Sequence, residues 1–475
     1  MTERAFVYRL RRGLGSAILE LQSNPNRRNY RDAVLRCCLR DISFDTQVEG
    51  TKGRYLYTAI CALGEQDVFE DILIGAFMRR LPDHLSEQLL DILVCYESAG
   101  GKKSKDALCT KMHDLVERLP KQRSFPFQFC EREQLETLMI HAVETGKWSA
   151  FQSCVADAGR MILRRGDDGC LFAGEFLWYC ENTFGWERVA RYLNAAAETS
   201  AEVKAFCENV PGGVPQYMRA NVGTPAKAKM FAKALNAAPK RQEVNGSSRA
   251  EIAMMLKTYV ARAEELAQDD FAYGRMWSVG RPLSKQAAPE DLRWLAARAA
   301  DEQSDEIRAN LLRVFWAVDF PGELSALIAY AERGCEHLKI AAVDALARFQ
   351  DPLVHALALR FIQTGDLDAG LPLLVKNWKK RDEETIRSQL LPTKCVPHST
   401  QWDLRDIYAR HRSNACGDIL EHVYENGPCA ACRFHIVEAM WENRVLNLRV
   451  LNECLYNSYE DTRKMAARIK KRLGS

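Results

Sequence analysis

The chain has 475 residues, of which 47% are hydrophobic and 27% are charged. This balance is typical of a soluble globular protein and excludes a disordered or collagen-like chain. No uncharged apolar run approaches the roughly 18 residues that a membrane-spanning helix needs, and the arginine-rich N-terminus lacks the apolar stretch of a signal peptide. We therefore expect a cytoplasmic protein with no membrane partner.

The net charge of +3 hides three strongly basic segments. Residues 1–40 hold nine arginines against three acids, residues 211–250 hold seven basic residues against one acid, and residues 463–475 hold six basic residues and no acid. These segments either converge into an anion-binding surface or are solvated helix faces, since helix C-termini favour Lys and Arg without any ligand. The sequence leaves both interpretations open.

Helical periodicity dominates from the N-terminus onward, because apolar residues recur at three- and four-residue spacing. No alternating or β-branched run is long enough to predict a sheet. Glycines follow many of the helical segments and prolines stand at turns or first helical positions. In the N-terminal part, the predicted helices are 4–22, 28–42, 52–64, 66–81, 84–98, 103–119, 131–146, 149–165, 170–184 and 186–208.

An irregular segment follows at residues 211–250, which is rich in Pro, Gly and Lys around one predicted helix at 225–237. Such composition is typical of a linker. We therefore divide the chain into an N-terminal helical array (1–210), a basic linker (211–250) and a C-terminal array (251–475). In the C-terminal array, the predicted helices are 248–268, 289–301, 305–317, 322–333, 336–349, 352–364, 368–378, 383–391, 402–412, 416–426, 430–442, 446–456 and 460–473.

An internal repeat is visible in this array, because residues 305–334 align with 336–365 at a constant offset of 31. Pro321 aligns with Pro352 at the turn inside the hairpin, and Gly334 aligns with Gly365 at its end. One helical hairpin cannot bury its own apolar face, so a repeated hairpin predicts a stack of such units.

The stretch 336–346, Glu-His-Leu-Lys-Ile-Ala-Ala-Val-Asp-Ala-Leu, resembles the second helix of a HEAT repeat. Asp305-Glu306-Ile307-Arg308 repeats its start, and looser copies stand at 384–387, 460–463 and 29–34. The resemblance to HEAT-repeat and armadillo-like proteins is clearest over 305–391. It implies an all-α solenoid of stacked antiparallel hairpins.

The resemblance favours a non-enzymatic scaffold or adaptor that binds a protein partner, since a solenoid presents a long surface. The sequence contains no phosphate-binding glycine loop, no Gly-x-Ser-x-Gly and no His-Glu-x-x-His. We therefore assign no catalytic residue and infer no small-molecule substrate. An active site assembled from residues far apart in sequence stays open.

Nucleic-acid binding is the alternative function, and some HEAT-like proteins are DNA glycosylases that hold duplex DNA in a basic groove. Such an interface here would use the repeated cations and the basic N-terminus, although the chain's pI of about 8.1 is lower than is usual for duplex-binding domains. These cations pair instead with acids of neighbouring repeats in the competing interpretation. The candidate residues are Arg308, Lys339, Arg387, Arg463, Arg27, Arg28 and Arg31.

Sixteen cysteines are scattered through apolar helical patterns, which is typical of buried thiols in a reducing compartment. Two short pairs stand out: Cys395 with His398, and Cys429 with Cys432. Each pair has a two-residue gap, and together they match a Cys3His zinc site, the one cofactor that we consider. Alternatively, Cys429 and Cys432 pack inward beneath the next repeat. A thioredoxin-like dithiol is disfavoured, because no βαβ pattern surrounds them.

Overall fold

The computed structural model describes residues 1–79, 83–118, 127–145, 148–165, 174–209, 248–269 and 272–474. Every regular element within these ranges is a helix, so the all-α prediction is confirmed. The chain divides into two compact units, which are described separately. Unit 1 comprises Met1–Pro239 and Leu455–Arg463, and unit 2 comprises Lys240–Cys454 and Lys464–Ser475.

Unit 1 is built from helices of uneven length. They are α1 (Glu3–Arg12), α2 (Gly15–Ser23), η1 (Arg27–Tyr30), α3 (Arg31–Cys38), α4 (Thr46–Glu49), α5 (Gly53–Leu63), α6 (Gln66–Phe77), α7 (Asp83–Ser98), α8 (Lys102–Arg118), α9 (Phe127–Glu144), α10 (Trp148–Arg165), α11 (Gly174–Phe184), α12 (Trp186–Ala197) and α13 (Ala201–Asn209). The sequence predicts one helix over 4–22, but Gly13 adopts a left-handed conformation (φ 72°) and divides it into α1 and α2.

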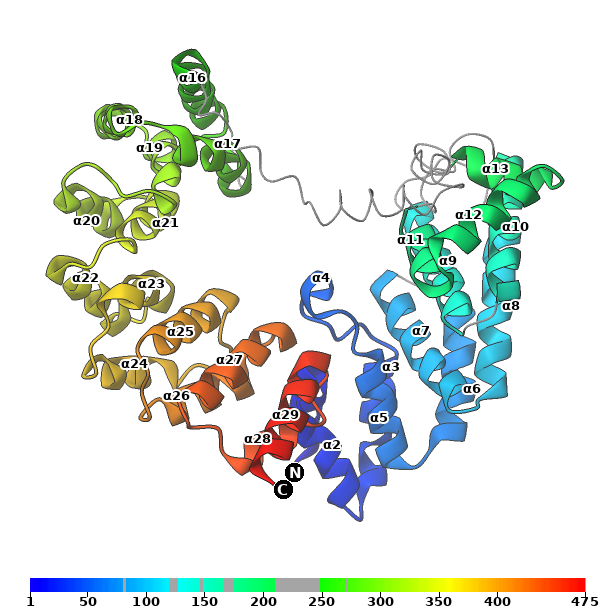
Figure 1. The fold of residues 1–475 in the computed structure, drawn as a ribbon. Helices are drawn as coiled ribbons and strands as arrows, with labels where there is room; N and C mark the ends of the chain where they lie inside the picture. Colours follow the sequence, from blue (N-terminus) through cyan, green and yellow to red (C-terminus); the bar gives the residue numbers. More distant parts are fainter. Residues whose placement is uncertain are drawn as a thin grey trace. The chain divides into compact units, whose positions relative to one another are not determined.

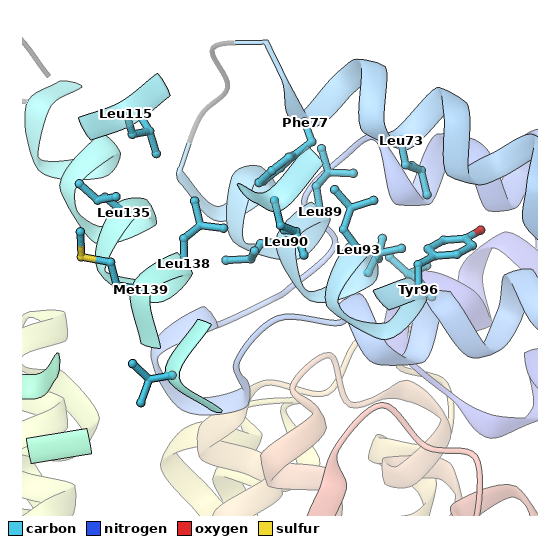
Figure 2. Packing of buried hydrophobic residues seen from close by; sticks show 14 of the residues in the cluster. Leu73, Phe77, Leu89, Leu90, Leu93, Tyr96, Leu115, Leu135, Leu138 and Met139 are labelled. Carbon is cyan, nitrogen blue, oxygen red and sulfur yellow. The ribbon is translucent and has the colours of Figure 1, made fainter. Parts of the chain in front are cut away.

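Two rows of helices form the middle of unit 1. Helices α5, α7, α9 and α11 pack one against the next, and α6, α8 and α10 form the second row (Figure 1). Leu73 and Phe77 of α6 interleave with leucines of α7, and Leu138 of α9 continues the same core (Figure 2). The result is a solenoid-like stack with a continuous apolar centre.

Unit 2 begins with three helices and continues as hairpins. Its helices are α16 (Arg249–Glu265), α17 (Ala272–Gln286), α18 (Pro289–Asp301), α19 (Asp305–Leu312), η2 (Arg313–Trp316), α20 (Leu324–Arg333), α21 (Glu336–Leu346), α22 (Pro352–Gln363), α23 (Leu367–Asn377), α24 (Asp382–Leu390), α25 (His398–Arg410), α26 (Gly417–Asn426), α27 (Ala430–Glu442) and α28 (Leu448–Cys454). The last helix, α29 (Glu460–Leu473), begins in the stretch assigned to unit 1. The sequence does not predict α17, because Pro282 and two glycines disguise its helical pattern.

The 31-residue period extends well beyond the two copies visible in the sequence. Helices α19, α21, α23, α25, α27 and α29 begin at intervals of 30 to 32 residues. Pro and Asp set several of these boundaries: Asp366 caps α23 by accepting from Ala369 N, and Asp351 caps α22 just before Pro352. The repeat therefore includes stretches whose apolar pattern has drifted.

Unit 2 also has two rows, and Figure 1 shows them along its arc. Helices α19, α21, α23, α25 and α27 pack in succession on the inner side of the arc, and we call them the inner row. Helices α20, α22, α24 and α26 form the outer row. Apolar residues such as Leu346 and Leu374 fill the space between the rows and are fully buried.

Two predictions from the sequence can be compared with the structure only over the described residues. Most of the predicted linker (211–250), including its helix at 225–237, lies outside them, so the linker stays a prediction. No helix in the described part of the chain is long and apolar enough to cross a membrane.

Candidate functional site

One position recurs in the helices that begin each repeat, namely their fourth residue. These residues are Arg308, Lys339, Gly370, Gln401, Arg433 and Arg463. Arg308 donates to the carbonyl oxygen of Ala299 (3.2 Å) and to that of Glu302, both in the segment that leads into its own helix. Gln401 repeats the pattern, because its amide donates to the carbonyl oxygen of Val396 (2.9 Å).

The two later copies, Arg433 and Arg463, make the same kind of contact. Arg433, which has no exposed surface, donates to the carbonyl oxygens of Gly427 (2.8 Å) and Pro428 (3.1 Å). Arg463 donates to those of Asn457 (2.6 Å) and Ser458 (2.7 Å). A buried carbonyl without a donor is costly, so these side chains stabilise the loop that precedes each helix.

The remaining repeated cations are paired with carboxylates. Lys339 contacts Asp366 at the start of the next inner-row helix, and this contact raises the Lys339 pKa. Arg387 pairs with Asp418 (2.7 Å) and Glu384 (2.7 Å). The sequence places Arg387 at the repeated position, but it lies on α24 of the outer row, and Arg433 stands at the equivalent place instead.

The N-terminal candidates lie near the start of α6. Arg28 and Arg31 both approach Glu65, at 3.5 and 2.9 Å, and Arg27 donates to the carbonyl oxygen of Leu63 at 3.3 Å. Arg28 is the most exposed of the three. Every repeated cation and each of these three arginines therefore already contacts an oxygen of the chain itself.

The inner row carries a cluster of carboxylates across three consecutive helices. Asp344 lies on α21, Asp368 on α23, and Asp403 with Asp406 on α25. Burial, followed by repulsion from Asp406, Asp368 and Asp344, raises the pKa of Asp403 to about 8. Burial likewise raises the pKa of Asp344 to about 6. We call these four residues the carboxylate cluster.

Neighbouring groups of the chain neutralise the negative charge of this cluster only in part. Asp406 pairs with Arg405 (2.5 Å), and Asp368 accepts from the hydroxyls of Ser399 (2.6 Å) and Thr400 (3.1 Å). Within the described residues, the Asp403 and Asp344 side chains make neither an ion pair nor a hydrogen bond. A cation brought by another molecule would therefore meet favourable charge here.

Exposed apolar groups lie on the same helices. Trp402 is 41% exposed on α25, its ring 4.8 Å from that of His435 on α27 and 5.2 Å from the Arg405 guanidinium. Ile340 is 39% exposed on α21. The inner row thus combines exposed apolar surface with the carboxylate cluster.

The predicted Cys3His set is only partly assembled. Val396 is fully buried and its N–H donates to the carbonyl oxygen of Asn426 (3.2 Å), while Cys395 before it is exposed. Cys395 lies in the bend at residues 394–395 and its exposed side chain does not join the buried cysteines. His398 is the first residue of α25, four residues ahead of the helix start that the sequence predicts.

The other three residues do come together. One ligand atom each from His398, Cys429 and Cys432 lies within 4.8 Å of the other two. His398 Nδ1 is 3.0 Å from the Cys432 sulfur, and Cys429 is the N-cap of α27. Both cysteines are buried and His398 is half-buried. We call these three residues the Cys2His cluster.

Two neighbouring side chains support the cluster. Arg433 holds the loop that carries Cys429 through its bonds to Gly427 and Pro428. The interaction of Cys432 with Cys429, followed by burial, raises the pKa of Cys432 well above its ordinary value, and Trp402 and Arg433 act to lower that pKa. His398 lies against the Cys432 sulfur, with its Nδ1 at 3.0 Å.

Three of the residues that matter here were not among the sequence candidates. A constant offset of 31 from Arg308 falls on Cys432 and misses Arg433 by one residue, because α25 and α27 begin 32 residues apart. Trp402 and Asp403 have no such signal, since their proximity to other groups depends on how successive repeats stack.

Comparison with known proteins adds no family assignment. No protein-family model matches the chain, and no curated protein shows significant similarity to it. The HEAT resemblance therefore stays an expectation from the sequence.

Proposed function

We propose that this protein is a non-enzymatic, HEAT-like scaffold or adaptor that binds a protein partner along the inner row of unit 2. The partner segment that fits this surface is rich in Lys and Arg. The observation that carries the proposal is the carboxylate cluster beside exposed Trp402, spread over three consecutive helices.

The charge of Asp403 supports a cationic partner. A carboxyl group whose pKa is raised to about 8 is held in an environment unfavourable to its anion. A Lys or Arg side chain from a partner would stabilise the anion, and the aliphatic part of that side chain would cover Trp402. In the free protein this carboxyl is largely protonated near neutral pH, so binding of a cation would release its proton.

The same contacts weigh against nucleic acid. Arg308, Lys339 and Arg387 are engaged by the chain's own oxygen atoms, so phosphates would have to displace existing bonds. Phosphates would also meet the carboxylate cluster on the inner row. A protein partner rich in Lys and Arg would not have to displace these bonds and would not be repelled by the carboxylates.

The test is purification of the untagged protein at low salt, with mass spectrometry of co-purifying proteins and absorbance at 260 and 280 nm. We expect a stoichiometric partner whose contact segment, located by cross-linking, is basic. Asp368→Asn/Asp406→Asn should lose that partner because it removes two charges from the inner row. Glu332→Gln/Glu384→Gln removes two charges from the outer row and should retain it.

Two results would overturn the proposal. One is a partner held equally well by both double variants, which would place binding elsewhere. The other is co-purifying nucleic acid that leaves as the salt concentration rises, which would favour phosphate contacts instead.

A further inference from the structure

We infer that His398, Cys429 and Cys432 form a zinc site with three protein ligands and an open fourth position, which joins helices α25 and α27. This inference is independent of the proposed partner. It rests on the geometry of the Cys2His cluster, the residues that support it, and a comparison with the equivalent positions of other repeats.

The separations fit the metal. Tetrahedral zinc with bonds of about 2.3 Å to sulfur and 2.0 Å to nitrogen keeps its ligand atoms roughly 3.5 to 3.8 Å apart. In the cluster, all three ligand atoms lie within 4.8 Å of one another, and His398 Nδ1 is 3.0 Å from the Cys432 sulfur. Shifts of about 1 Å, within reach of small side-chain rotations, bring them to zinc-bound distances.

Cysteine is not one of the preferred N-cap residues, yet it stands at position 429. Ser, Thr, Asp and Asn are the preferred N-caps, and Ser304 and Asp366 fill this role in α19 and α23. The Cys429 sulfur accepts from the Cys432 N–H at 3.5 Å, an ordinary distance for sulfur, and so caps α27 as well. Cys335 stands at the equivalent N-cap of α21, where the structure shows no such cluster within the described residues.

The surroundings are those of a metal site rather than of an isolated thiol. Metal ligands are usually oriented by a second layer of hydrogen bonds. Here Arg433 donates to the carbonyl oxygens of Gly427 and Pro428 and so fixes the loop before Cys429. By contrast, buried Cys416 donates to the carbonyl oxygen of Ser413 (3.1 Å) and belongs to no ligand group in the described part of the chain.

The coordination is incomplete by one ligand. Cys395 is exposed and is not part of the cluster, and half-buried His398 leaves the site reachable by solvent. Three protein ligands with a fourth position for water or an outside ligand is the pattern of an accessible zinc ion. Zinc suits mixed thiolate and imidazole donors better than magnesium or calcium does.

The first experiment measures zinc in the untagged, full-length protein purified under reducing conditions. We expect about one zinc per chain, a value that one three-ligand site predicts. His398→Ala, Cys429→Ser and Cys432→Ser should each lose it. Cys335→Ser, the matched change at the equivalent N-cap, and Cys395→Ser should both keep it.

The second experiment avoids variants that fail to fold. The wild-type protein is stripped with a chelator and titrated with Co²⁺, which should give a thiolate-to-cobalt absorption band that zinc abolishes. Zinc should also raise the melting temperature of the stripped protein, because it binds the native state.

Three outcomes would overturn the inference. Wild-type protein that neither contains zinc nor binds Co²⁺ would show that the cluster is only a set of hydrogen-bonded thiols. A disulfide between Cys429 and Cys432 in freshly purified protein would show a redox pair. Loss of zinc in Cys395→Ser would replace the open position with a fourth cysteine ligand.

Discussion

Units 1 and 2 bury an apolar core in the same way, but they differ in how regularly their helices are spaced along the sequence. Both stack helices in two rows around an apolar core, but in unit 1 the starts of successive helices in one row, such as Gly53 of α5, Asp83 of α7 and Phe127 of α9, follow no constant interval. In unit 2, the inner row begins a new helix every 31 or 32 residues. A solenoid-like stack therefore does not require a sequence period.

The polar contacts differ in the same way. In unit 2, the fourth residue of several helices bonds carbonyls only a few residues away. In unit 1, Gln88 of α7 donates to the carbonyl oxygens of Cys37, Cys38 and Arg40, about fifty residues away. A local contact can be copied with each repeat, whereas a distant one has to be built separately. The fourth residue of these helices thus still follows the repeat in stretches where the apolar residues no longer do.

The largest expected effect tests the core of the periodic unit. Leu346→Asp places an unpaired charge among fully buried side chains of α21 and should destabilise unit 2 by about 4 kcal/mol or more. The free energy of unfolding from urea titrations, followed by circular dichroism, measures it. Ile340→Asp on the same helix is exposed and should change stability by about 0.5 kcal/mol or less. Equal effects would mean that the repeat packs in another register.

The second prediction contrasts buried charge in the two units. In unit 1, buried Lys52 pairs with Glu49 (2.8 Å), whereas Asp403 in unit 2 lies among other carboxylates. The Asp403 pKa is about 8 when folded and about 4 when unfolded, so the native state binds the extra proton between these values. Stability should therefore fall as pH rises from about 4 to 8.

Asp403→Asn removes this pH dependence. The variant should match the wild type near pH 4 and exceed its stability by roughly 2 to 5 kcal/mol near pH 8. Melting temperatures across the pH range give the measurement. Asp368→Asn removes one neighbouring carboxylate and should lower the Asp403 pKa. The pH range over which stability falls should therefore become narrower but should not disappear. A wild-type stability that does not change between these pH values would contradict the assigned environment of Asp403.

The architecture could be predicted from the sequence to the extent that its signals are local. Helix periodicity and glycine stops gave the fold class, and the 31-residue offset gave two of the repeats. Helix α17 was missed because Pro282 lies inside it, and Arg387 was placed in the wrong row because its local motif resembles that of Arg308. Local patterns do not specify which row a helix joins.

The candidate sites were harder to predict because they form between repeats. The spacing of Cys429 and Cys432 was informative, and His398 joined them as expected. Cys395 did not, because it lies exposed in the bend that precedes α25. The carboxylate cluster has no sequence signal at all, since its members come from three helices.

The third prediction compares the two kinds of polar contact directly. Gln88→Glu and Gln401→Glu each replace a donating amide by a carboxylate that faces carbonyl oxygens. We expect losses of about 3 kcal/mol for Gln88→Glu, which ties three carbonyls, and about 2 kcal/mol for Gln401→Glu. Gln363→Glu is exposed and serves as the control. A larger loss of stability for Gln401→Glu than for Gln88→Glu would show that the local contact matters more than the distant one.

The smallest expected effect compares two contributions to stability: capping of a helix, and an ion pair between neighbouring repeats. Asp366 caps α23 and also contacts Lys339 of the preceding repeat, whereas Thr2 caps α1 by accepting from Ala5 N at 3.3 Å. Asp366→Ala should cost about 1 to 2 kcal/mol, because it removes both contacts, and Thr2→Ala about 0.5 to 1 kcal/mol.

Asp366→Asn then divides the two contributions. Asparagine caps helices as well as aspartate does, so this variant keeps the cap and loses only the attraction to Lys339. Its loss should be about 0.5 kcal/mol, and combining it with Lys339→Met should add almost nothing, since the pair is already broken. Fully additive losses would show that the Lys339 ammonium group also stabilises the repeat through its cation–π contact with the Phe361 ring, which Lys339→Met removes as well.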